Sequence, residues 1–140
     1  MRSDRLVQTH DLAHTYVAAG GAQPMPFADG ASLIPVPVRD EILCAYYGGE
    51  YLYTQRIAIT SRFKYVFNGF DYDELYDLER DPDELHNVVS APEYAKPCDD
   101  MRARLYDLMA RFEDPYGDRP YQAHADRYCA PRYLPRGKRS

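Results

Sequence analysis

The chain has 140 residues, enough for one compact domain, because single domains commonly hold about 100–150 residues. Hydrophobic residues make up 45% of it and charged residues 28%, which is typical of a soluble globular protein. The net charge of −5 argues against nonspecific nucleic-acid binding, which relies on many cationic side chains. No apolar run of about 18 residues indicates a membrane helix. The polar amino terminus offers no signal-peptide core, so the chain as given is expected either in the cytoplasm or as a piece of a longer protein whose targeting signal lies elsewhere.

The first predicted element is a helix over residues 9–19. Leu12, Tyr16 and Ala19 fall on one stripe of that helix. Asp11 places a carboxylate in the first turn, where the helix dipole favours it, and Gly20 supplies the stop. Residues 22–40 then form a loop rich in proline and glycine, because its prolines exclude a long regular element.

The middle of the chain has the pattern of β-strands. Strands are predicted at 42–47, 51–60, 63–67 and 74–78 from alternating side chains and from turn signals such as Asn68-Gly69. Connections this short require antiparallel neighbours. The chain contains 14 tyrosines, and seven of them lie between Tyr46 and Tyr76. This concentration indicates either a sheet with one solvent-exposed face or a platform that stacks sugar rings.

A long helix follows near the carboxyl end and is the clearest element of the sequence. Asp99 and Asp100 favour its start, Pro115 prevents its extension, and one apolar stripe runs along it: Met101, Leu105, Leu108, Met109 and Phe112. The predicted fold is therefore α+β. A small antiparallel sheet of about four strands is covered by this helix, with the extra amino-terminal helix and the proline- and glycine-rich loop before it.

Three segments, read in order, resemble the end of type I sulfatases, members of the alkaline phosphatase superfamily. Residues 7–20, VQTHDLAHTYVAAG, are similar to a family helix that ends in glycine, with His14 where proline is usual. Residues 29–33, DGASL, resemble the family's D-G-x-S-L. Residues 62–68, RFKYVFN, and 74–88, ELYDLERDPDELHNV, resemble the hallmark of the sulfatase carboxy-terminal subdomain. The resemblance covers about residues 7–112.

The resemblance implies a division of the chain into three parts. Residues 1–40 correspond to the tail end of the sulfatase catalytic domain, 41–114 to the carboxy-terminal sheet and helix, and 115–140 to a wrapping or disordered tail. A complete sulfatase of this kind uses a formylglycine, made from the cysteine of a C-x-P/A-S-R motif, and a calcium ion bound by carboxylates. Its substrate is a sulfate ester.

None of these catalytic parts is identifiable in the chain. The segment 129–132, CAPR, lacks the serine of the nucleophile motif. The pair Asp99-Asp100 resembles metal-binding carboxylates but is interpreted as a helix start. The pair His10 and His14 has the i, i+4 spacing of metal ligands without a third ligand, and the 124–126 segment, HAD, is weaker still. The three cysteines, Cys44, Cys98 and Cys129, indicate neither a disulfide framework nor a zinc site. We therefore expect no catalytic residue, no metal ligand and no cofactor in this chain.

The sequence is interpreted as the carboxy-terminal part of a sulfatase, from a truncated or split gene or a misannotated reading frame, and inactive alone. Its expected partner is the missing catalytic domain, and Tyr46, Tyr47 and Arg56 are the candidate substrate contacts. Two alternatives stay open: a noncatalytic module that binds a partner or carbohydrate, and a fragment of a related phosphodiesterase or phosphonate hydrolase. Neither nucleic acid nor membrane is expected as a partner.

Overall fold

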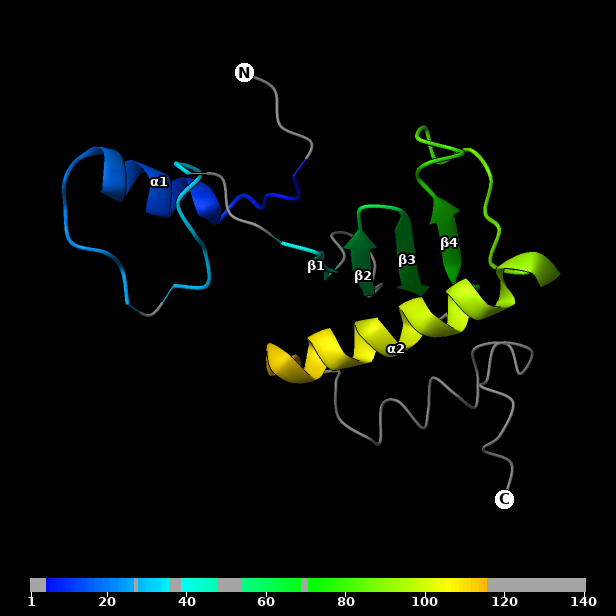
Figure 1. Cartoon of the computed structure of the whole chain (residues 1–140). Helices are drawn as coiled ribbons and strands as arrows, with labels where there is room; N and C mark the ends of the chain where they lie inside the picture. The colour runs from blue at the N-terminus through cyan, green and yellow to red at the C-terminus, as the bar shows by residue number, and fades with distance from the viewer. Residues whose placement is uncertain (1–4, 27, 36–38, 48–53, 69–70, 116–140) are drawn as a thin grey trace. The chain divides into compact units, whose positions relative to one another are not determined.

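The computed structural model describes residues 5–26, 28–35, 39–47, 54–68 and 71–115 (Figure 1). The chain forms two compact units, Met1–Ile42 and Leu43–Ser140, and their division falls inside the first strand. The expected division at residues 40 and 114 stays a prediction, and the expected tail lies outside the described residues from 116 onward. No helix in the described part of the chain has the length and apolar character needed to cross a bilayer.

The first unit is built on helix α1 (Asp11–Ala19) and the loop that returns along it. The Thr15 hydroxyl accepts a hydrogen bond of 2.9 Å from the backbone amide of Leu33, which holds the loop to the helix. The loop passes so close to the start of α1 that a Cβ on Gly30 would lie 2.5 Å from the carbonyl oxygen of His10. Only glycine fits at that position without a shift of the backbone.

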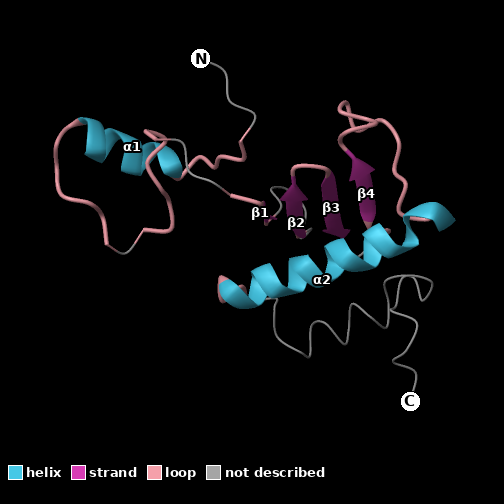
Figure 2. Cartoon of the chain, viewed as in Figure 1, coloured by secondary structure: helices cyan, strands magenta, loops and turns pink. Residues whose placement is uncertain are grey.

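The second unit contains a four-stranded antiparallel sheet in the order β1-β2-β3-β4, as the sequence predicts (Figure 2). Its strands are β1 (Glu41–Tyr46), β2 (Gln55–Thr60), β3 (Phe63–Asn68) and β4 (Glu74–Asp77). Ala58 of β2 lies opposite Tyr65 of β3, which in turn lies opposite Leu75 of β4. All three of these side chains are fully buried, and they define the inner face of the sheet.

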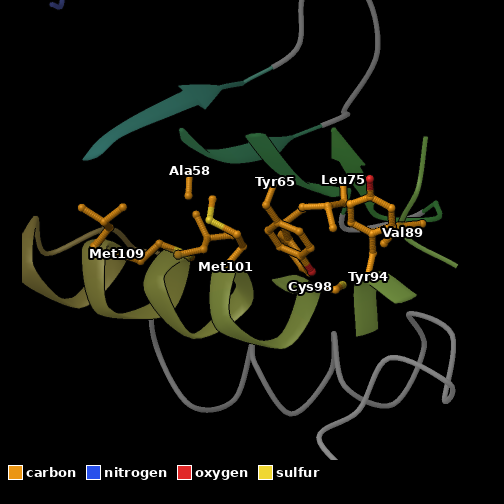
Figure 3. Packing of buried hydrophobic residues seen from close by; sticks show 11 residues of the cluster. Ala58, Tyr65, Leu75, Val89, Tyr94, Cys98, Met101 and Met109 are labelled. Atoms are coloured by element: carbon orange, nitrogen blue, oxygen red, sulfur yellow. The ribbon is translucent and has the colours of Figure 1, made fainter. Parts of the chain in front are cut away.

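Helix α2 (Ala95–Arg111) lies across that inner face, directly after the short 3₁₀ turn η1 (Pro92–Tyr94) (Figure 1). Its apolar stripe packs on the strands, and Figure 3 shows the two sets of side chains meeting between helix and sheet. The predicted core residues Leu105, Leu108 and Met109 are each at most 1% exposed. The helix therefore supplies about half of the core, as its periodicity predicts.

The ends of α2 differ from the prediction. The helix begins at Ala95, before the Asp99-Asp100 pair, and its first turn includes Pro97. Proline is tolerated in a first turn because the backbone amides there have no partner within the helix. The other end stops at Arg111, so Phe112 is the cap residue and is 48% exposed rather than part of the buried stripe.

Strand β4 also departs from the expected pattern of burial. The charge of Asp77 favours a position in water beside Glu74, but Asp77 is only 2% exposed. Side chains alternate along a strand, so Asp77 shares the inner face with Leu75, whereas Glu74 and Tyr76 share the other. The Asn87 side chain binds the backbone of the same region: it accepts from the amide of Leu75 at 3.0 Å and donates to the carbonyl of Asp73 at 3.2 Å.

Candidate ligand-binding surface

Two of the predicted contact residues, Tyr47 and Arg56, meet next to the end of β1, where Tyr46 also lies. Tyr46 ends β1 and Tyr47 follows it, and their side chains are 49% and 59% exposed. Arg56, on β2, places its guanidinium carbon 4.5 Å from the centre of the Tyr47 ring. A guanidinium on the face of an aromatic ring is attracted by the ring's electron density. The two tyrosines are therefore accessible to a ligand, and one of them rests on a cation.

Arg56 differs from the tyrosines because it is buried, with 1% exposure. Its Nε donates to a carboxylate oxygen of Asp114 at 2.6 Å, and its Nη1 donates to the carbonyl of Gln55 at 2.9 Å. Asp114 lies just beyond α2, so the ion pair joins the end of the helix to the sheet. Within this chain, Arg56 supports the surface from beneath instead of presenting its charge to solvent.

The candidate metal ligands are not brought together. Asp99 and Asp100 project from α2 toward water, and each faces a cation: Arg102 at 3.6 Å and Lys96 at 2.5 Å, respectively. His14 lies against Gly30, and among the described residues no group of three or more His, Cys, Asp or Glu side chains could hold a metal ion. The described part of the chain therefore does not fit the calcium ion of a sulfatase. Cys129 and the 124–126 segment lie outside the described residues.

A buried cluster of three polar side chains lies inside the second unit and was missed by the sequence analysis. We call Tyr65, Asp73 and Arg102 the core polar cluster. The Tyr65 hydroxyl donates to Asp73 at 2.5 Å and accepts from Nε of Arg102 at 3.0 Å. Burial raises the pKa of Asp73 and raises that of Tyr65 well above its usual value. The cluster ties α2 to the turn between β3 and β4, so its geometry indicates a structural role.

Two further buried carboxylates are also held by arginine. In the first unit, both carboxylate oxygens of Asp11 accept from Arg39, and one of them accepts from the amide of Ala31 at 2.9 Å. In the second unit, Asp77 accepts from Arg62 at 3.0 Å. The hydrogen bonds from these arginines hold the pKa of each carboxyl below its usual range. Both carboxylates therefore have a structural role. Sequence periodicity does not predict which arginine each of them binds.

The fold and the site define a class of protein. It has a small antiparallel sheet with one covering helix, and a unit made of a helix and a loop comes before the sheet in the sequence. Its described residues carry exposed tyrosines at the end of β1 and form no metal-binding cluster. The sequence profile of the N-sulphoglucosamine sulphohydrolase carboxy-terminal domain matches residues 1–111. The chain belongs to this family of sulfatase carboxy-terminal domains.

Proteins that are similar in sequence agree with this assignment. An uncharacterized protein of Haemophilus influenzae is 29% identical over 121 residues, covering 82% of this chain and 62% of the relative. An uncharacterized sulfatase of Escherichia coli is 40% identical over 67 residues, covering 48% of this chain and 13% of the relative. A choline-sulfatase of Rhizobium meliloti is 36% identical over 97 residues, covering 61% and 19%. The chain thus spans under two thirds of the first relative and under a fifth of the two sulfatases.

Solved structures show the same relation. The fold is similar to part of a 2-O GAG sulfatase, with a TM-score of 0.71, 26% identity, and coverage of 83% of this chain and 28% of the other. It is also similar to a protein solved in complex with its substrate, D-glucosamine-2-N,6-O-disulfate, with a TM-score of 0.65, 26% identity, and coverage of 74% and 24%. A phosphonate monoester hydrolase of Agrobacterium radiobacter gives a TM-score of 0.64 at 25% identity, covering 76% and 25%.

Proposed function

We propose that this chain acts as the carboxy-terminal subdomain of a sulfuric ester hydrolase and contributes one wall of the substrate cleft, while a catalytic domain performs the hydrolysis. The observation that carries this proposal is the family match over residues 1–111, together with alignment to only 13% and 19% of two sulfatases. The catalytic domain is proposed to lie either in the same polypeptide or in a separate one.

The chemistry of the described side chains supports the proposal that hydrolysis takes place on a catalytic domain and not on this chain. Attack on a sulfate ester needs positive charge or a metal ion where negative charge develops. Here the arginines Arg39, Arg56 and Arg62 are each engaged by a carboxylate, so their charge is compensated within the chain. The calcium ion and formylglycine implied by the resemblance belong, in this proposal, to the catalytic domain. The chain alone should then hydrolyse no sulfate ester.

The proposed substrate is a sulfated sugar, and the proposed contacts are Tyr46 and Tyr47, with Arg56 acting from below. The exposed rings support this choice because a tyrosine presents an apolar face and a polar tip to a ligand. One structural relative was solved with a sulfated glucosamine, which points to the same class of substrate. The likeness to a phosphonate monoester hydrolase favours one alternative, hydrolysis of a phosphonate ester on the same scaffold.

A chimera tests the proposed function. The segment of the Rhizobium meliloti choline-sulfatase that aligns with this chain, 97 residues long, would be replaced by the corresponding residues of this protein. We expect the chimera to hydrolyse an aryl sulfate, which carries no quaternary ammonium group, whereas the same enzyme with the segment deleted, and this chain alone, do not. Turnover of an aryl sulfate by the purified chain would contradict the proposal, as would a chimera no more active than the deletion.

A further inference from the structure

The Tyr47 ring has a cation on one face, and much of the side chain is exposed to solvent. The guanidinium carbon of Arg56 lies 4.5 Å from the centre of the ring, on one face, and the Tyr47 side chain is 59% exposed. Arg56 itself is 1% exposed and so cannot meet a ligand from solvent. The group that a ligand meets at this place is therefore the open side of an aromatic ring.

The position of that ring depends on how α2 ends. Glu113 adopts a left-handed backbone with a φ of 51°, which a residue other than glycine adopts only at a cost. This conformation lets the amide of Asp114 donate to the carbonyl of Met109 at 2.8 Å, the bond of a Schellman turn. The turn directs the Asp114 carboxylate to Arg56, at 2.6 Å from its Nε. The strained turn, the ion pair and the ring thus form one continuous series of contacts.

We propose that Tyr47 is a stacking residue for the pyranose ring of a sulfated sugar, and that Arg56 and Asp114 are positioning residues that fix its ring plane. This inference rests on the proposed function, and it assigns how the sugar proposed there is bound and which residues fix the ring that binds it. A sugar offers C–H groups to the ring face. A quaternary ammonium ester would instead depend on cation–π attraction to a ring whose other face already interacts with Arg56, so it gains less there than on a free ring.

Ligand binding to the full 140-residue chain tests this inference without a catalytic domain. The probes are glucosamine 6-sulfate and choline sulfate, followed by saturation-transfer NMR. We expect saturation of the sugar's ring protons and much weaker transfer to the choline methyl groups. Tyr47→Ala should weaken binding of the sugar about tenfold, and Tyr47→Phe should leave it within about twofold, because stacking uses the ring and not the hydroxyl.

Two further variants separate stacking from a general effect of exposed tyrosine. Tyr72 is 60% exposed, so Tyr72→Ala is the matched control and should bind as the parent does. Asp114→Asn should weaken sugar binding about threefold while the circular dichroism spectrum stays native, since the carboxylate that holds Arg56 is lost. The inference is overturned if Tyr47→Ala binds the sugar as tightly as the parent, or if choline sulfate binds equally well.

The outcomes of the two experiments are independent. An inactive chimera together with Tyr47-dependent sugar binding would refute the proposed function and leave a carbohydrate-binding module. An active chimera together with binding that ignores Tyr47→Ala would keep the sulfatase subdomain and refute the stacking role.

Discussion

The contact between α2 and the sheet is tested by replacing Leu105 with alanine. Leu105 is fully buried, in one apolar cluster with Leu108 of the helix and Tyr65 of β3. Removing its branched end loses transfer free energy and leaves a cavity, which typically costs about 2–5 kcal/mol. The complete burial of the site favours the upper part of that range, about 4 kcal/mol. A domain of this size has a net stability of only about 5–15 kcal/mol, so the variant should be close to unfolding.

The assay is urea unfolding followed by circular dichroism. With a slope of about 2 kcal/mol per molar urea, a loss of about 4 kcal/mol lowers the midpoint by about 2 M. Leu85 provides the matched control, because it is 72% exposed and Leu85→Ala makes the same chemical change at the surface. The control should stay within about 0.5 kcal/mol of the parent. If Leu105→Ala melts together with the parent, α2 does not hold the sheet and the core described above is wrong.

Three more expectations concern the first unit. The pKa of Asp11 is lowered in the folded chain by its bonds to Arg39, so the stability it contributes is complete above the unfolded pKa of about 3.9 and is lost as the pH falls below that value. Hydrogen-exchange protection of the Ala31 amide, which donates to Asp11, should fall over that range, and constant protection would refute the assignment. Gly30→Ala should lower the stability of this unit by about 1–3 kcal/mol, because the new Cβ would lie 2.5 Å from the carbonyl oxygen of His10; an unchanged melting temperature would contradict this. The exposed apolar side chains of α1 should drive self-association of the purified chain, and a monomeric mass by light scattering at high concentration would count against it.

Periodicity made most of the second unit predictable from the sequence. The stripe that includes Leu105 and Leu108 identifies α2 because a helix repeats every 3.6 residues, and β3 follows from the alternation of Phe63, Tyr65 and Phe67. The same rule of alternation would have placed Asp77 on the buried face. Its charge argued for solvent, and the partner that compensates it, Arg62, lies 15 residues away on another element.

The contacts between buried polar side chains could not be predicted from patterns in the sequence. Tyr65 and Arg102 are 37 residues apart, and Asp11 and Arg39 are 28 apart, so only the folded chain brings each pair together. The candidate ligand-binding surface could be predicted in part. Tyr47 was selected because tyrosines crowd this region. Its contact with Arg56 depends on how the strands pair and on how α2 ends, and the sequence alone does not define either of these precisely enough to place the two side chains.

The hydrogen bonds that Asn87 and Val88 make with β4 have a consequence for aggregation. A strand at the border of a sheet presents unpaired amides and carbonyls, which are a template for strands of other molecules and for amyloid growth. On the outer side of β4, the Asn87 side chain occupies the amide of Leu75, and the amide of Val88 occupies its carbonyl at 2.9 Å. Residues 81–88 of the hallmark therefore shield this part of the border, and replacing Asn87 with alanine would leave the amide of Leu75 available to a strand of another molecule.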